Sequence, residues 1–332
     1  MKGDEEMIHK LGKTDIGKLS LCVALLLVGF VGISYATNKQ ECTKDSKEKT
    51  GFIISSAPCG TYGIITTRTK GAQDVIVRYM VHRPAGVPKA LVVLFAGGNG
   101  DTGIEGDPAT GEVTKAGNNF LVRSAQLFAK NRYLAVTIDR PRVGPTLTPE
   151  FPTNIEFDQY RISAEHGTDI EAVISEVNTE DLPVFLAGTS RGALSAVAQH
   201  KLDLGIVGIL LASPETSSGG PGTLYIGHPN YPNLQPEFVT VFAHVLAHEL
   251  DGCFVSTPEN SEKLHHDFIN AGIDSRFDEI KGGFDLTGTD NITACDAKTH
   301  HGFLGVENKA VKKITKRMDQ ILKAIKKRSV KE

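Results

Sequence analysis

The feature that most constrains this 332-residue chain is a pentapeptide, Gly-Thr-Ser-Arg-Gly, at positions 188–192. The apolar residues 184–187 before it predict a short buried strand, and residues 193–201 after it predict a helix. A serine between two glycines at such a junction matches the tight strand-to-helix turn that exposes a nucleophilic hydroxyl, because larger flanking side chains would clash with neighbouring backbone. The pentapeptide alone occurs by chance, but in this context it makes Ser190 a candidate nucleophile.

Strand and helix patterns alternate along the rest of the chain. Continuous apolar runs such as 90–96 suit strands that are buried on both faces of a parallel sheet. We therefore predict an α/β fold with a mostly parallel central sheet and helices on both faces. The first two strands, which are separated by a turn at Gly71, predict a hairpin. The predicted strands are 62–68, 74–83, 90–96, 134–139, 184–187, 206–212, 275–280 and one within 239–249, and the predicted helices are 119–130, 164–177, 193–201, 261–271 and 306–327.

The longest irregular stretch of the body is 213–236, which contains four glycines in 219–227 and several prolines. It follows a predicted sheet strand, and ligands bind open α/β sheets at the carboxyl ends of strands. The stretch is either a lid or pocket wall, or a plain surface loop.

A nucleophilic serine needs a histidine base and an acid that orients the base. His301 is the preferred base, because the glycine after it lets the backbone bring the ring inward; His300 is the competitor. Asp251 is the preferred acid, since it follows a predicted strand and opens an Asp-Gly turn, although such turns also occur without any catalytic role. Glu249 and Asp278 are lesser candidates for the acid.

Stabilisation of a tetrahedral oxyanion needs two backbone N–H donors. The N–H of Arg191, directly after the candidate nucleophile, is one candidate. The loop after the strand at 90–96 reads Gly-Gly-Asn-Gly, and its small residues would let the backbone approach a substrate oxygen. The second donor is therefore predicted to be Gly98 or Asn99.

Three further polar residues, Arg161, His166 and Asp169, precede or open the predicted helix at 164–177. A capped helix with local ion pairs explains them more simply than contact with a substrate does.

These motifs together resemble the α/β-hydrolase superfamily over residues 81–324. More narrowly, the chain resembles a group of exported bacterial α/β hydrolases that carry a cysteine just after the acid and another shortly before a His-Gly-Phe. The resemblance implies a Ser190, Asp251 and His301 triad, acyl transfer, and most simply a carboxylic ester hydrolase for a small substrate. The chain lacks the HGGG motif of many lipases and esterases, which speaks against a large acyl substrate.

Four cysteines follow the N-terminal apolar segment, and they allow two disulfides in three connectivities. The resemblance implies that Cys253 and Cys295 join the acid loop to the histidine loop. Cys42 and Cys59 would then form the second disulfide.

The N-terminus resembles an export signal. Lysines precede the apolar run 19–35, and Ser34 and Ala36 are the small residues expected before a cut at Thr37. We therefore predict a signal peptide at 1–36, a polar tether at 37–50, a single domain at 51–332, and a periplasmic or secreted protein. The alternative is an uncleaved anchor, which would give weak membrane association through this segment.

Other function classes are less consistent with the sequence. A formal net charge of −3 provides no general attraction for nucleic acid. His244 and His248 are followed by Glu249, but the zinc motif H-E-x-x-H is incomplete, so we expect no metal and no cofactor. Two alternatives to an esterase remain, a peptidase or amidase that uses the same residues, and a non-catalytic binding protein on a hydrolase scaffold.

Overall fold

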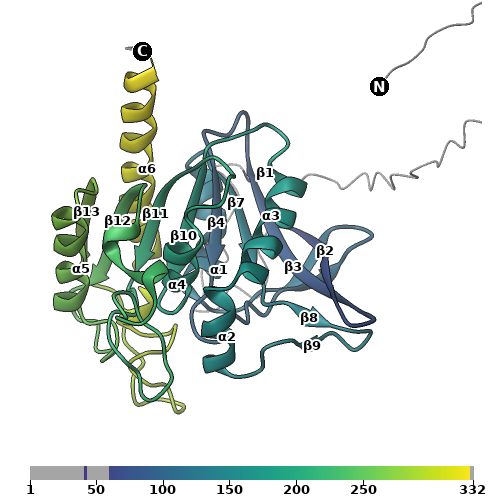
Figure 1. Cartoon of the computed structure of the whole chain (residues 1–332), viewed down its shortest axis with the longest axis horizontal. Helices are drawn as coiled ribbons and strands as arrows, with labels where there is room; N and C mark the ends of the chain where they lie inside the picture. Colours follow the sequence, from purple (N-terminus) through teal and green to yellow (C-terminus); the bar gives the residue numbers. More distant parts are fainter. Residues whose placement is uncertain (1–40, 43–59, 330–332) are drawn as a thin grey trace, which may run out of the picture. The chain divides into compact units, whose positions relative to one another are not determined.

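The computed structural model describes residues 41–42 and 60–329 (Figure 1), which all belong to one compact unit, Ala36–Glu332. The predicted signal peptide, residues 1–36, lies outside the described residues. Cys59, the predicted partner of Cys42, lies outside them as well. No helix among the described residues is long and apolar enough to span a membrane.

A mixed sheet forms the centre of the fold. Six neighbouring strands are parallel, and two long strands at one side of them run antiparallel to their neighbours. In spatial order these eight strands are β13 (Ser275–Ile280), β12 (Phe242–His248), β11 (Ile206–Ala212), β10 (Val184–Thr189), β4 (Leu91–Phe95), β7 (Leu134–Ile138), β3 (Gln73–Pro84) and β2 (Gly60–Lys70).

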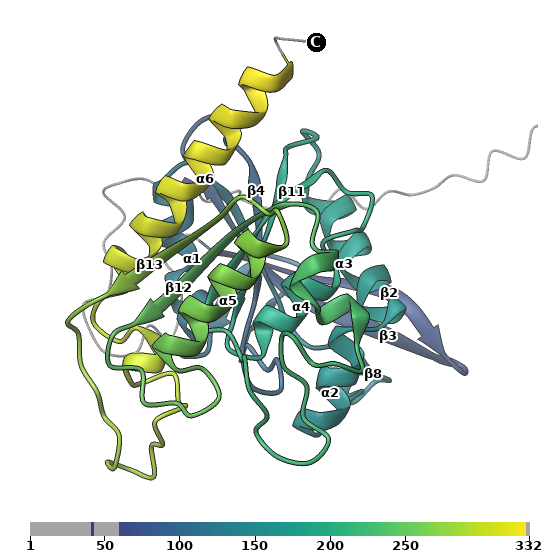
Figure 2. The same ribbon diagram turned by 60° about the vertical axis from the view of Figure 1, so that its left-hand side comes forward.

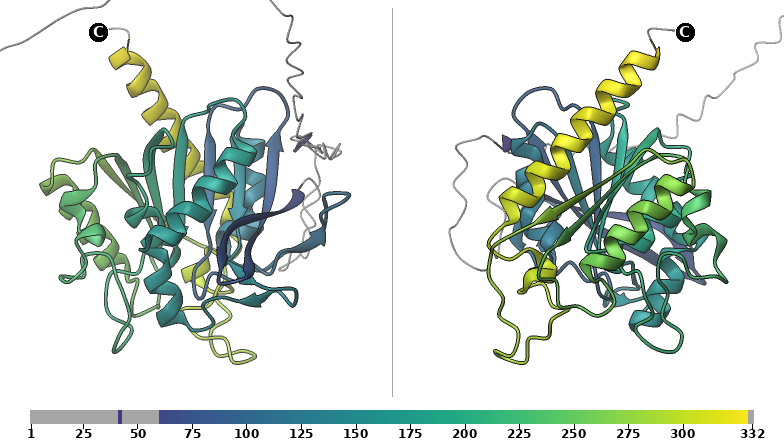
Figure 3. Two further views of the ribbon diagram at one scale, coloured as in Figure 1. Left: turned by 45° about the vertical axis from the view of Figure 1, so that its right-hand side comes forward. Right: turned by 90° about the vertical axis from the view of Figure 1, so that its left-hand side faces the viewer.

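Helices cover both faces of this sheet, as predicted (Figures 2 and 3). The two faces carry separate apolar clusters, and the central strands contribute alternate side chains to each cluster because successive residues of a strand point to opposite faces. One face is covered by α3 (Ala164–Val177), α4 (Gly192–Ala198) and α5 (Pro258–Asn270), and the other by α1 (Phe120–Lys130) and α6 (Glu307–Ser329).

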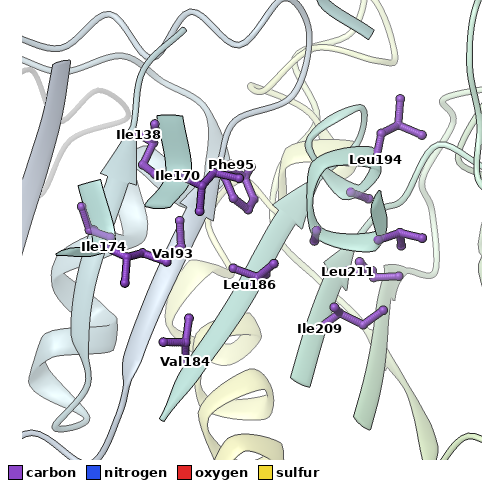
Figure 4. Packing of buried hydrophobic residues seen from close by; sticks show 14 of the residues in the cluster. Val93, Phe95, Ile138, Ile170, Ile174, Val184, Leu186, Leu194, Ile209 and Leu211 are labelled. Carbon is purple, nitrogen blue, oxygen red and sulfur yellow. The ribbon is translucent and has the colours of Figure 1, made fainter. Parts of the chain in front are cut away.

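Close packing makes the central strands nearly inaccessible to water. Every residue of β4, β7 and β10 is buried. Figure 4 shows Ile170 and Ile174 of α3 on the side of Val93, and Leu194 of α4 on the side of Leu211, all within one apolar cluster. Burial of such side chains contributes roughly 1.5–3 kcal/mol each, which makes this cluster a rigid base for the loops above it.

The strand order reverses beside β4. The chain passes from β4 through α1 to β7 on one side, and then returns across β4 to β10 on the other side. Ligands bind at such a switch point, beyond the carboxyl ends of the strands. The loops after β4 and β10 meet there, and these loops carry the Gly-Gly-Asn sequence and Ser190.

The predicted hairpin is present, since β2 pairs with β3 around Gly71. The sequence analysis missed one helix, α2 (Asn154–Arg161), and the short strands β5 (Glu105–Asp107), β6 (Glu112–Lys115), β8 (Arg142–Val143) and β9 (Thr148–Pro149). Strand β1 (Glu41–Cys42), which pairs with β3, was also missed.

The stretch 213–236 is packed against the body, since its apolar side chains Leu224, Ile226 and Leu234 are buried in the α4 and α5 face of the core. It contains the short 3-10 turn η1 (Pro232–Leu234), and a second 3-10 turn, η2 (Pro236–Phe238), begins at its last residue. Its role as a lid or pocket wall stays a prediction.

Candidate active site

Ser190 lies in a sharp turn between β10 and α4. Its φ is 53°, a left-handed conformation that non-glycine residues adopt rarely, and its N–H donates to Ala212 O at 3.0 Å. A Cβ on Gly188 would come within 2.2 Å of Gly192 O, and one on Gly192 would come within 2.3 Å of Phe95 O. Both flanking glycines are therefore required. The sheet is mostly parallel, its strand order reverses beside β4, and the loop after β4 lies against this turn. This topology, with a serine in the turn after β10, settles the architecture. The chain has the α/β-hydrolase fold.

His301 and Asp251 form a buried hydrogen-bonded pair. His301 Nδ1 donates to Asp251 Oδ2 at 3.0 Å, while Asp251 Oδ1 accepts from Cys253 N at 2.9 Å. These bonds fix the tautomer that carries the proton on Nδ1. The other ring nitrogen, Nε2, is buried and has no hydrogen-bond partner among the described residues, so its lone pair is free to accept a proton. A Cβ on Gly302 would lie 2.1 Å from Ala297 O, which explains the glycine after this histidine.

The competing residues are engaged elsewhere. His300 Nδ1 pairs with Asp285 at 3.1 Å, and the His300 ring stacks on His248 with centroids 4.4 Å apart. Glu249 pairs with Lys281. Asp278 forms a separate cluster of hydrogen bonds with His244, Arg276 and Lys313, and these partners hold its pKa well below the usual range despite partial burial.

Several contacts gather the candidate loops around Ser190. A Cβ on Gly97 would lie 3.0 Å from Ser190 Cβ and 3.5 Å from the side-chain nitrogen of Asn119, so the loop after β4 lies directly against the serine. Arg123 of α1 is buried and donates to the backbone oxygens of Asn118 and Gly302. It thereby joins the start of α1 to the loop that carries His301.

The predicted oxyanion donors lie on the two sides of this junction. Arg191 N–H starts α4, and Gly98 and Asn99 follow β4. Within the described part of the chain, none of these three N–H groups donates to another acceptor. Gly98 has a φ of 57°, which favours glycine at this position.

A buried charge cluster, which the sequence analysis did not foresee, lies beneath these donors. It comprises Asp158 and Arg161 of α2, the Arg191 side chain, and Glu215, which follows β11. Burial raises the pKa of Glu215 to about 7, and burial lowers the pKa of Arg161 to about 10. Glu215 was missed, although its position just beyond the end of β11 was a sequence signal that could have pointed to it.

The sequence analysis explained three polar residues by a capped helix with local ion pairs, namely Arg161, His166 and Asp169. This explanation holds only in part. Ser163 caps α3 by accepting from His166 N. Asp169, however, binds Arg68 of β2, which is distant in the sequence, and also accepts from the Tyr160 hydroxyl. The His166 ring is buried, which lowers its pKa well below the usual range and keeps the ring neutral.

No group of three or more possible metal ligands exists among the described residues. His244 and His248 of β12 bind different partners, since His244 Nε2 pairs with Asp278 and His248 Nε2 donates to Gly282 O.

The predicted Cys253–Cys295 disulfide is present, with the two Cα atoms 4.6 Å apart. Cys253 lies two residues after Asp251, and Cys295 lies six residues before His301. The covalent bond and the Asp251–His301 hydrogen bond therefore join the same two loops.

Reduction of this disulfide is expected to lower the predicted hydrolase activity before it unfolds the protein. Its two ends are 42 residues apart, so the chain-entropy model assigns about 3–4 kcal/mol of stabilisation, while the sheet itself does not depend on it. Activity and far-UV circular dichroism should be followed as reductant is added at equilibrium. Activity should fall first, and the double variant Cys253→Ala, Cys295→Ala should behave likewise without reductant. Parallel loss of activity and secondary structure would contradict a local role for the bond.

Comparisons with known proteins find similarity in structure alone. No family model and no curated protein matches the sequence. The hyperthermophilic esterase of the archaeon Pyrobaculum calidifontis is 17% identical over 80% of this chain and 86% of that chain, with a TM-score of 0.47. An esterase from Thermogutta terrifontis, solved with propionate, is 15% identical over 80% of this chain and 94% of that chain, with a TM-score of 0.47. An esterase from Pyrococcus furiosus is 12% identical over 79% of this chain and 92% of that chain, with a TM-score of 0.48.

Proposed function

We propose that the chain is a serine hydrolase that transfers acyl groups to water, with Ser190 as nucleophile, His301 as base and Asp251 as the acid that orients the base. One observation carries the proposal. A buried histidine, oriented through Nδ1 by a carboxylate, has an unpaired Nε2. Arg123 joins its loop to the start of α1, which lies beside the strained strand-to-helix turn of Ser190.

The proposed reaction has two halves. His301 Nε2 takes the Ser190 proton as Oγ attacks the substrate carbonyl, and the imidazolium is stabilised by Asp251. The resulting oxyanion accepts hydrogen bonds from Arg191 N–H and from Gly98 or Asn99 N–H, and α4 begins at the same point. Collapse breaks the bond to the leaving group, which receives the proton from His301. Water then repeats these steps on the acyl-enzyme, releasing the acid and restoring Ser190.

The substrate class that we propose is a small carboxylic ester. Ester hydrolysis makes the smallest demand on this arrangement, because an alkoxide leaves more readily than an amide nitrogen. A peptidase or amidase would use the same residues, and it differs only in its leaving group.

The test combines a reactive probe with a substrate panel. A fluorophosphonate should label the folded protein covalently on Ser190, which peptide mapping identifies. Short-chain nitrophenyl esters should be hydrolysed faster than long-chain esters and peptides. A folded protein that neither reacts with the probe nor hydrolyses any ester would instead be a binding protein on a hydrolase scaffold.

We also propose export with removal of residues 1–36, on the strength of the Ser34 and Ala36 cleavage pattern. The expected mature protein starts at Thr37 and is recovered from the periplasm or the medium. Intact mass and N-terminal sequencing of the native protein check this. Recovery of the full-length chain in the membrane fraction would support the uncleaved anchor.

A further inference from the structure

Helix α2 places two buried charged side chains one turn apart beneath the candidate oxyanion donors. Asp158 is fully buried and Arg161 is 1% exposed. They reach opposite sides of the Ser190 turn, because Arg161 contacts the loop after β4 while Asp158 contacts the residue directly after the serine.

Arg161 binds three neutral oxygens. Its guanidinium donates to Ala96 O at 2.7 Å, to Gly98 O at 3.2 Å and to Ser195 Oγ of α4 at 2.9 Å. It therefore joins the loop after β4 to the helix that follows Ser190. No carboxylate of the described residues accepts a hydrogen bond from it, although Asp158 and Glu215 are close enough to favour its charge.

These bonds fix the direction of the loop's N–H groups. A trans peptide unit is planar and its C=O and N–H point in opposite directions. By holding Gly98 O, Arg161 orients the N–H of Asn99, and by holding Ala96 O it orients the N–H of Gly97. The remaining peptide of the loop is set by the turn in which Gly100 N donates to Gly97 O at 3.1 Å.

Asp158 acts on the other donor. Its Oδ2 accepts from Arg191 Nη1, and Glu215 Oε2 lies 3.2 Å from Arg191 Nε. Two carboxylates thus hold the side chain of the residue whose N–H starts α4. Glu215 N also donates to Ser190 O, which adds a backbone link to the same turn.

We propose that Asp158 and Arg161 are positioning residues of the oxyanion hole, and that α2 sets the geometry of both donors together. This inference rests on the proposed acyl transfer. The donors must meet an oxygen that becomes charged only in the transition state, so their alignment affects kcat more than KM. A role in packing alone would affect stability and leave both kinetic constants unchanged.

The test compares Arg161→Met, Arg161→Lys and Asp158→Asn with Arg317→Met. Arg317 is a matched control because it is a buried arginine (8% exposed) that donates to Asp274. Asp274 directly precedes the edge strand β13, so it lies at the end of the parallel strands opposite to the one that carries Ser190. Loss of one oxyanion donor lowers kcat by roughly 10²–10³-fold in known cases. We expect kcat to fall about 100-fold in Arg161→Met and about 10-fold in Asp158→Asn, with KM within about threefold. Arg161→Lys should recover part of the loss.

A pair of inhibitors separates positioning from packing. A trifluoromethyl ketone forms a tetrahedral adduct with Ser190 whose oxyanion occupies the hole, whereas the matching methyl ketone binds without it. In the Arg161 and Asp158 variants, the inhibition constant of the trifluoromethyl ketone should rise by the same factor by which kcat/KM falls. The inhibition constant of the methyl ketone should stay constant. Arg317→Met should lower the melting temperature and leave both inhibition constants unchanged.

The outcomes distinguish the two proposals. A folded wild-type protein that neither hydrolyses esters nor reacts with a fluorophosphonate overturns the proposed function. An active wild type whose Arg161 and Asp158 variants keep kcat within threefold, or lose affinity equally for both ketones, overturns the inference alone. Should Arg161→Met fail to fold, Arg161→Lys and Asp158→Asn decide by the same criteria.

Discussion

Replacing Ser190 with alanine is expected to lower ester hydrolysis by at least about 10⁴-fold and to abolish covalent labelling. No other group in the proposed mechanism can form the acyl-enzyme, so only binding and electrostatic stabilisation remain. The fold should survive, because Ser190 is half-buried and its hydroxyl makes no hydrogen bond to another described residue. Initial rates, gel-based labelling and thermal unfolding of the same preparation provide the measurements.

Two matched variants sharpen this prediction. Ser175→Ala changes an exposed serine on α3, and it should keep both activity and labelling. Ser190→Gly should be as inactive as the alanine variant but slightly more stable, because glycine adopts a φ of 53° without the strain that other residues have. Full labelling of Ser190→Ala would place the reactive group elsewhere in the chain.

The second large effect is expected at His301. His301→Ala should lower kcat by about 10⁴-fold, because Ser190 then lacks the base that removes its proton. His300→Ala should keep kcat within a fewfold of the wild type, since that ring pairs with Asp285 and stacks on His248. Kinetics of the two variants at one pH, with circular dichroism as a folding control, make the comparison.

Asp251→Asn gives an independent check on the same pair. The amide keeps the size of the side chain but favours the wrong histidine tautomer, so kcat should fall with little change in folding. A large loss of kcat in His300→Ala, together with a small loss in His301→Ala, would instead assign the base to His300. The base would then not be the residue that pairs with Asp251.

The strongly apolar elements could be predicted from the sequence. Strands such as 184–187 and the glycines around Ser190 are dictated locally, by continuous burial and by backbone clashes within a few residues. The structure also pairs His301, and not His300, with Asp251, a choice that the neighbouring glycine favoured but could not decide. That choice depends on Asp285 and His248, which come from other loops.

Helix α2 and the charge cluster could not be predicted in the same way. The helix has only eight residues, and its polar composition hides the apolar periodicity. Its local signal is a capping box, in which Thr153 and Glu156 exchange hydrogen bonds, and this was overlooked. The partners of Asp158 and Arg161 lie more than thirty positions away in the sequence. Such long-range pairing has no local signature.

With the proposed export, the Cys253–Cys295 bond would also make catalysis depend on the compartment that the chain has reached. Thiols stay reduced in the cytosol of most organisms and become oxidised outside it. A newly made chain in the cytosol would hold its acid and base loops together through one hydrogen bond and packing alone. With the proposed export, full activity would arise only outside the cytosol, when oxidation closes the bond. The cytosolic esters of the producing cell would be protected from the enzyme during its synthesis.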